Sequence, residues 1–269
     1  MGKGIAQTFA QNNHEVLLYN PNIFSANDSL GQIDRSLNNL VLKGKITQEE
    51  KNNYFGNLKV IESLSNAHNI EFAIEAVTEN MEIKKKVFIE MDSIINSDVI
   101  LATNTSSLSI TELALITKRP EKIIGMHFFN PAPIMSLVEV VYGMTTTDNT
   151  VEFIKKLSLD LGKHPVLVEE SPGFIVNRIL IPMINEAVSV LYEGVSSIEE
   201  IDIAMKNGAN HPIGPFALAD LIGIDVCVDI LDTLYAEFGM AKYAANPLLR
   251  KMVRANKKGR KTKEGFYKY

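Results

Sequence analysis

The first part of the chain alternates short apolar runs with longer amphipathic segments. Helical periodicity is clearest from Ile83 to Ile95, where apolar residues recur at every fourth position and Lys84 falls on another face. Strands are predicted by seven runs rich in aliphatic and β-branched residues: EVLLY, NLKVI, EFAIEAV, DVILAT, KIIGMHFF, LVEVV and PVLV. The alternation predicts βαβ units and a doubly wound α/β domain with a largely parallel sheet.

The pattern changes after the loop EESPG. From Pro172 onward almost no strand signal remains, and successive helical segments are interrupted by Pro212 and Pro215. We therefore expect two domains, an α/β domain over residues 1–168 and an all-helical domain over residues 169–269. The basic cluster KKGRKTKEGFYKY at the end of the second domain is expected to be a solvated tail.

Composition narrows the range of functions. The 269 residues are 46% apolar and 22% charged, as in a folded globular protein. The net charge of −5 gives no basic field for nucleic acid, and no apolar run approaches the roughly 18 residues of a membrane span. We therefore expect neither nucleic acid nor a membrane as a partner, and the sequence predicts no metal site. The single cysteine, Cys227, lies in the apolar stretch IGIDVCVDIL, which favours a buried thiol. The single buried cysteine and the lack of a secretory pattern at the N-terminus favour the reducing cytoplasm as the location of the protein.

The opening stretch MGKGIAQTFAQNNHEVLLYN raises a specific hypothesis. Gly2 and Gly4 precede an amphipathic helix, and the strand that follows ends at the polar Asn20. In dinucleotide-binding folds a glycine-rich turn leads into a helix whose N-terminus faces the pyrophosphate, and the next strand ends at a ribose-contacting residue. A glycine beside a start codon can also be accidental. These few residues leave both interpretations open.

Two residues twelve positions apart suggest a catalytic pair. His127 closes the run IIGMH, and Glu139 lies between valines in LVEVV. A carboxylate in such surroundings needs a cation or a strong donor, and His127 would provide one. A structural histidine and an edge-strand glutamate are the alternatives.

Two further polar residues stand out in the same way. Ser106 follows the run DVILAT, at the kind of strand end where α/β sheets bind ligands, although NTSSLSITE is also a helix-entry signal. Asn177 lies in the apolar segment FIVNRILIP, where a buried amide needs partners, although it could simply bond across the domain boundary.

Five stretches together resemble the 3-hydroxyacyl-CoA dehydrogenase family: NTSSLSITELA, MHFFNPAPIMSLVEVV, SPGFIVNRILIPMINEA, HPIGPFALADLIGID and GRKTKEGFYKY. The resemblance covers essentially the whole chain, and it is closest to the short-chain bacterial members that act on 3-hydroxybutyryl-CoA. It implies NAD-dependent interconversion of 3-hydroxybutyryl-CoA and acetoacetyl-CoA. It also implies a Rossmann-like NAD-binding domain and a helical domain for substrate binding and homodimer formation.

The resemblance assigns roles to the reacting residues. His127 corresponds to the catalytic acid/base, and Glu139 to the residue that fixes its tautomer and orientation. Ser106 corresponds to a contact with the substrate's 3-oxygen that also borders the cofactor. Asn177 corresponds to a contact near the reacting carbon, which would complete a site at the junction of the two domains.

For NAD, the resemblance implies contacts from Gly2 and Asn20, and from Glu79 and Lys84 beside the ribose and nicotinamide. Many relatives have an acidic residue where this chain has Asn20. An amide still binds a ribose hydroxyl, and no Arg or Lys follows Asn20 in PNIF to bind a 2′-phosphate, so NAD is expected over NADP.

For coenzyme A, the resemblance implies phosphate contacts from Ser36 and Lys43 in SLNNLVLKGK. A solvated helix end is the alternative for Lys43. Relatives often have lysine where this chain has Ser136, which bears on the fit of the acyl-CoA.

The family pattern begins with a strand and then G-x-G-x-M-G-x-G-I-A, and this sequence starts at the methionine inside that pattern. The sheet is therefore expected to be truncated at its first strand and to lack the first two glycines. We expect the chain as given to bind NAD poorly while its helical domain and dimer contacts persist. Two alternatives remain open. One is a catalytically impaired remnant that binds CoA or dimerises, and the other is a related hydroxyacid or sugar-acid dehydrogenase, against which Ser36 and Lys43 argue.

Overall fold

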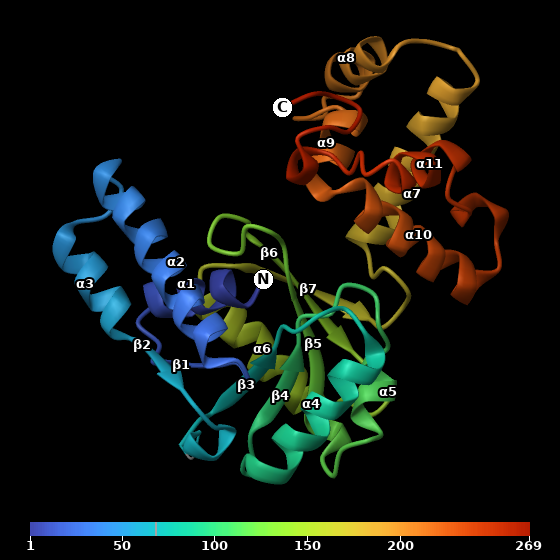
Figure 1. Ribbon diagram of the computed structural model, residues 1–269. Helices are drawn as coiled ribbons and strands as arrows, with labels where there is room; N and C mark the ends of the chain where they lie inside the picture. Colours follow the sequence, from blue (N-terminus) through green and yellow to red (C-terminus); the bar gives the residue numbers. More distant parts are fainter. Residues whose placement is uncertain (68) are drawn as a thin grey trace. The chain divides into compact units, whose positions relative to one another are not determined.

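The chain divides into two compact units, Met1–Glu170 and Ser171–Tyr269. The computed structural model describes residues 1–67 and 69–269 (Figure 1). Within these residues, no helix is both long and apolar enough to cross a membrane. Each unit has its own hydrophobic core, so each is described by itself.

The described residues of the first unit form seven strands, and each of the seven apolar runs overlaps one of them. Two strands form a small parallel sheet, β1 (Val16–Tyr19) and β2 (Leu58–Ile61). The other five form a sheet in the order β3-β4-β5-β6-β7. Their bounds are Phe72–Glu75, Ile100–Thr103, Ile123–Phe128, Leu137–Tyr142 and His164–Glu169.

Most strand pairs are parallel, as the alternating pattern predicts, but β5 and β6 are antiparallel. The doubly wound sheet is present in two parts, because β1 and β3 belong to different sheets and do not pair. Helices of this unit are α1 (Gly2–Gln11), α2 (Ile23–Leu42), α3 (Gln48–Gly56), α4 (Met81–Ile94), α5 (Ile110–Ala114) and α6 (Asp148–Asp160). Short 3₁₀ turns lie at Leu64–Asn66 and Pro120–Lys122.

Helix α1 packs against both sheets. Its Ile5 and Phe9 join the core formed with the five-stranded sheet and α6. Its Ala6 and Ala10 join a second core, formed with α2 and the start of β2. Figure 1 shows α1 and α2 beside the β1-β2 sheet. One helix therefore links the two parts of the sheet.

The predicted core face of α4 is right only toward the end of the helix, where Met91 and Ile95 are each 5% exposed. Ile83 is 42% exposed, whereas Lys84 is 1% exposed. Phe88 and Met91 share the buried face with Lys84. The lysine is accommodated there because its ammonium group is held by the buried carboxylate of Glu75.

The second unit is helical throughout its named elements. These are α7 (Val176–Tyr192), α8 (Ile198–Gly208), α9 (Pro215–Ile222), α10 (Ile224–Phe238) and α11 (Pro247–Arg254), with 3₁₀ turns at Ala241–Tyr243 and Arg260–Thr262. Pro215 occupies the first turn of α9, where its missing N–H has no helical partner to lose. The buried faces of α7 to α11 meet in one apolar core.

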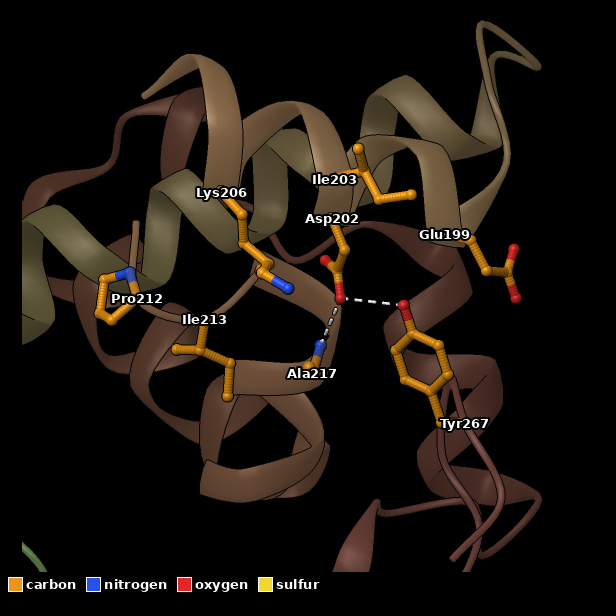
Figure 2. Close-up of a pocket in the computed structure, with 9 residues that line it drawn as sticks. Glu199, Asp202, Ile203, Lys206, Pro212, Ile213, Ala217 and Tyr267 are labelled. Carbon is orange, nitrogen blue, oxygen red and sulfur yellow. Dashed lines mark hydrogen bonds between the residues drawn. The ribbon is translucent and has the colours of Figure 1, made fainter. Parts of the chain in front are cut away.

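The expectation of a solvated tail at the C-terminus is wrong. The Asp220 carboxylate, 1% exposed, accepts hydrogen bonds from the backbone N–H groups of Phe266 and Tyr267, each at 2.9 Å. The Tyr267 hydroxyl donates to Asp202 at 2.9 Å, beside a cavity of about 310 Å³ lined by α8, α9 and Tyr267 (Figure 2). A Cβ at Gly265 would overlap the Asp220 carboxylate, so this close approach requires glycine. Two buried aspartates thus hold the tail on the helices.

Cys227 is fully buried in the core of the second unit, as its apolar context indicated. Burial, with a smaller contribution from Asp225, raises the pKa of its thiol to about 12. The thiolate is the reactive form, so about one thiol in 10⁴ is reactive at pH 8.

We expect Cys227 to resist a thiol-specific reagent such as Ellman's reagent in the native protein and to react fully in guanidinium chloride. The released chromophore measures the modified thiol. Rapid reaction of one thiol per chain under native conditions would contradict the burial of Cys227.

Candidate active site

The antiparallel pair β5-β6 places His127 directly opposite Glu139. Residues opposite one another on neighbouring strands project from the same face of the sheet, with Cβ atoms about 5 Å apart. His127 Nδ1 lies 2.7 Å from Glu139 Oε2. His127 is 6% exposed and Glu139 is 1% exposed. The structure therefore brings the two residues of the candidate catalytic pair together in a largely water-excluded position.

The pairing constrains the tautomer of His127. An ionised carboxylate only accepts hydrogen bonds, so a neutral imidazole facing it carries its proton on Nδ1. The lone pair is then on Nε2, the nitrogen that does not face Glu139. Phe129 packs against the ring, with centroids 4.6 Å apart and planes at 53°. The geometry suits an acid/base that exchanges a proton through Nε2.

Close approach of β5 and β6 depends on Gly125, two residues before His127. Gly125 pairs with Val141 across the two strands. A Cβ at Gly125 would lie 2.9 Å from Val141 Cβ and 3.0 Å from Ile110 Cδ1, closer than ordinary contact allows. Glycine at this position lets the strands and α5 pack around the His127–Glu139 pair.

Ser106 lies in the loop that follows β4, between β4 and the start of α5 at Ile110. Because β4 and β5 are parallel neighbours, their carboxyl ends share one edge of the sheet. The Asn104 side chain joins the two ends by accepting a hydrogen bond from Phe128 N at 2.9 Å. Ser106 and His127 therefore belong to the same edge of the five-stranded sheet.

Glu79 holds the Ser106 loop. Its Oε1 accepts hydrogen bonds from Thr105 Oγ1 at 2.6 Å, from Ser106 N at 2.7 Å and from Ser106 Oγ at 3.1 Å. Its Oε2 lies 3.3 Å from Lys84 Nζ. Burial raises the pKa of the Glu79 carboxyl, but Lys84 and the hydrogen bonds from Thr105 and Ser106 outweigh burial and hold the pKa below its ordinary value. Glu79 is therefore ionised at neutral pH.

Sequence reasoning missed Glu75, the last residue of β3. It is 3% exposed, and it bonds to Lys84 Nζ through both oxygens, at 2.9 and 3.1 Å. It also accepts a hydrogen bond from Thr103 Oγ1 at 2.7 Å. The signal that drew attention to Glu139, a carboxylate inside an apolar strand, is also present for Glu75 in EFAIEAV.

Asn177 lies in the second unit, in the first turn of α7. It is half-buried there, not fully buried as its apolar neighbours suggested. A tight turn precedes it, with positive φ at Gly173 (73°) and Phe174 (52°). Arg178 anchors the turn through a hydrogen bond from Nη1 to Ser171 Oγ at 3.0 Å. The turn fixes where α7 begins and thereby the position of Asn177 within its unit.

The start of α1 has features of a dinucleotide site. A Cβ at Gly2 would lie 3.7 Å from Ala76 Cβ, so the helix begins beside the carboxyl end of β3. No acidic residue lies in the first turn of α1, which leaves its N-terminal N–H groups suited to an anion. Asn20 directly follows β1 and is exposed, with its Oδ1 accepting a hydrogen bond from Asn22 N at 2.9 Å. These residues fit the pyrophosphate and a ribose of NAD.

Ser36 and Lys43 both belong to the α2 region. They are seven residues apart, close to two helical turns, so they project from the same side. Ser36 is half-buried, and Lys43, the C-cap residue of α2, is exposed. The arrangement suits a phosphate-bearing ligand along α2.

The chain matches known families over its whole length. The NAD-binding domain of 3-hydroxyacyl-CoA dehydrogenase matches residues 1–171, and the C-terminal domain of the same enzyme matches residues 173–269. The chain belongs to the 3-hydroxyacyl-CoA dehydrogenase family.

Individual relatives agree with this assignment. The chain is 54% identical to the 3-hydroxybutyryl-CoA dehydrogenase of Clostridioides difficile over 269 residues, which cover 100% of this chain and 96% of that protein. Its fold is similar to crystal structures of FadB2 from M. tuberculosis (TM-score 0.98, 35% identity) and of (S)-3-hydroxybutyryl-CoA dehydrogenase PaaH1 from Ralstonia eutropha (TM-score 0.96, 46% identity). Each alignment covers 100% of this chain and 95% of the solved chain.

Proposed function

We propose that this protein is an oxidoreductase that interconverts (S)-3-hydroxybutyryl-CoA and acetoacetyl-CoA with NAD(H). The observation that carries the proposal is the buried His127–Glu139 pair, at 2.7 Å, at the sheet edge of a chain that belongs to this family. The names of its relatives support the four-carbon substrate. The same matches favour an active dehydrogenase over a remnant that only binds CoA or dimerises.

His127 is the acid/base in this proposal. When the alcohol is oxidised, Nε2 of His127 accepts the proton of the 3-hydroxyl group while the hydride leaves C3, and the C3–O bond becomes a carbonyl. NAD held by Gly2, Asn20 and Glu79 would supply the acceptor for that hydride, and NADH would supply the donor in the reverse direction. Glu139 keeps the Nδ1–H tautomer and stabilises the imidazolium that forms, as a carboxylate does beside the histidine of a hydrolase triad.

Ser106 and Asn177 complete the proposed substrate site. The Ser106 hydroxyl contacts the 3-oxygen, and the Asn177 amide contacts the substrate near the reacting carbon. Donors aimed at an oxygen that gains negative charge lower the barrier, because they are oriented before the reaction begins. The family resemblance supports both roles.

The binding regions follow from the same assignment. The N-terminus of α1 at Gly2 would bind the NAD pyrophosphate, Asn20 would bind a ribose hydroxyl, and Glu79 would lie beside the ribose and nicotinamide. Lys84, whose side chain is 1% exposed, acts there by holding the Glu79 carboxylate, with Nζ 3.3 Å from Glu79 Oε2. Ser36 and Lys43 on α2 bind the phosphates of coenzyme A.

Replacing either residue of the pair tests the function. His127→Asn should lower kcat for acetoacetyl-CoA reduction by about 10³-fold, because the proton donor is lost. Glu139→Gln should lower it by about 10²-fold or more, because the tautomer is no longer fixed. NADH consumption measures both.

His14→Asn is the matched control, since His14 packs edge-on against Phe9 at the opposite end of β1 from Asn20. It should keep kcat within about twofold, because it does not touch the reacting groups. Wild-type turnover by folded His127→Asn protein would refute the proposed function.

Cofactor choice provides an independent test. Asn20 binds a ribose hydroxyl without the charge that repels a 2′-phosphate, so kcat/KM should favour NADH over NADPH by about tenfold. Asn20→Asp should widen that preference through charge repulsion. A preference of the unchanged protein for NADPH would contradict the assignment.

The helical unit is proposed to form a homodimer. Within the described residues of that unit, large apolar side chains remain exposed on α7 and just after it, including Ile179 (68%), Tyr192 (64%) and Val195 (68%). Exposed apolar surface of this kind is typical of interaction sites. Light scattering should give twice the mass of one chain, and a mass of one chain at micromolar concentration would contradict the dimer.

The proposed compartment is the reducing cytoplasm. Support comes from Cys227, the single cysteine of the sequence, which is free and buried. A disulfide-linked species in freshly purified protein would argue against it.

A further inference from the structure

A buried charge network lies directly behind the Ser106 loop. Its members are Glu75 on β3, Lys84 on α4, and Glu79 between them in the sequence. Lys84 Nζ lies 2.9 Å from Glu75 Oε1 and 3.3 Å from Glu79 Oε2. The Lys84 and Glu75 side chains are 1% and 0% exposed, whereas that of Glu79 is 37% exposed. The network therefore runs from the core of the first unit to its surface.

Glu75 is the fully buried partner of Lys84, so its removal would leave the buried ammonium group without a counter-charge in the core. An ammonium group out of water needs a compensating charge beside it. Glu79 is too exposed to provide that charge in the core by itself. Without Glu75, the Lys84 side chain is expected to move toward water and toward Glu79. The position of the Glu79 carboxylate is thus tied to a residue that it does not contact directly.

Two routes connect Glu75 to the first half of the loop. At its start, Glu75 Oε2 accepts from Thr103 Oγ1, and Thr103 Oγ1 in turn accepts from Thr105 N at 3.2 Å. At Ser106, Glu75 acts through Lys84 and Glu79, whose Oε1 accepts from Ser106 N and Ser106 Oγ. Both routes converge on residues 103–106, so one buried carboxylate contributes to the contacts on each side of Thr105.

We propose that Glu75 is a positioning residue for the reaction: it holds Lys84 against Glu79 and thereby sets the orientation of Ser106 toward the substrate. The proposal rests on the proposed function, which gives Ser106 its role. Glu75 itself touches neither substrate nor cofactor. Its effect reaches the site through Thr103 and Lys84.

The test is Glu75→Gln, which keeps the shape of the side chain and removes its charge. Ser106 should lose its fixed orientation, so kcat for acetoacetyl-CoA reduction at saturating NADH should fall about tenfold or more. Amide hydrogen exchange, measured without any ligand, should be at least about tenfold faster at residues 103–107, because the bond from Ser106 N to Glu79 weakens.

Asp92→Asn is the matched control, because it breaks another buried ion pair made by the same helix. Asp92 Oδ1 lies 2.8 Å from Arg119 Nε, and both side chains are at most 6% exposed. Arg119 donates to the backbone carbonyls of residues 92, 95, 96 and 99, at the end of α4 remote from Lys84. Asp92→Asn should lower the melting temperature comparably while leaving kcat and exchange at residues 103–107 unchanged.

A double-mutant cycle checks the route through Lys84. If Glu75 acts through Lys84, the fold-losses in kcat for Glu75→Gln and Lys84→Met should not multiply in the double variant. Independent, multiplicative effects would overturn the proposed route. Unchanged kcat and unchanged exchange in Glu75→Gln, with only a loss of stability like that of Asp92→Asn, would overturn the positioning role.

The two hypotheses fail separately. Turnover that survives His127→Asn refutes the proposed function whatever Glu75→Gln does. Turnover lost in His127→Asn but retained in Glu75→Gln refutes the positioning role alone. The exchange measurement still tests the structural link from Glu75 to Ser106 if turnover is too slow to measure.

Discussion

The antiparallel pairing of β5 with β6 is the constraint on which the site depends. It interrupts an otherwise parallel sheet and sets His127 opposite Glu139, so a buried carboxylate gains a donor at 2.7 Å. A shift of one residue in this register would send each side chain to the other face and leave Glu139 without that partner. Gly125 permits the close approach, because any larger residue would meet Val141. Backbone pairing, more than loop geometry, therefore fixes the orientation of the imidazole.

The same physical rule operates elsewhere in the five-stranded sheet. Glu75 and Glu139 are both buried in strands of the five-stranded sheet, and each needs a partner because an isolated carboxylate in the core is costly. Glu139 is paired with His127, the proposed acid/base, and Glu75 is paired with Lys84. One buried carboxylate can thus orient a reacting group while the other orients a loop. Both carboxylates lie in the five-stranded sheet, but Glu139 is paired within the sheet whereas Glu75 is paired with a helix.

Much of the fold could be predicted from the local pattern of apolar residues, and the predictions that were wrong have a common cause. Strand positions could be predicted because aliphatic and β-branched runs favour packed, extended strands, and β5 and β6 are buried along most of their length. The partnership of His127 with Glu139 could be anticipated because valines surround the carboxylate. Hydrophobic periodicity did not predict the burial of Lys84, because an ion pair with Glu75 on β3 lets this charged residue occupy the core face of α4. The prediction of a solvated C-terminal tail was wrong for the same reason, because the residues that bind the tail, Asp202 and Asp220, lie far earlier in the sequence. Long-range polar partners are not visible in hydrophobic periodicity.

The split sheet makes α1 responsible for the geometry of the proposed cofactor site. Asn20 follows a strand of the two-stranded sheet, whereas Glu79 and Ser106 follow strands of the five-stranded sheet. Among the described residues no strand pairing joins the two sheets, so their relative position depends on packing through α1 and through Val16 of β1. Small residues make this possible: Gly4 lies against Ala132, while Ala6 and Ala10 pack into the core around α2. Packing alone is less directional than a hydrogen-bonded ladder, because dispersion contacts tolerate small sliding motions. The distance between the two halves of the cofactor site is therefore less firmly fixed than the distance between His127 and Glu139.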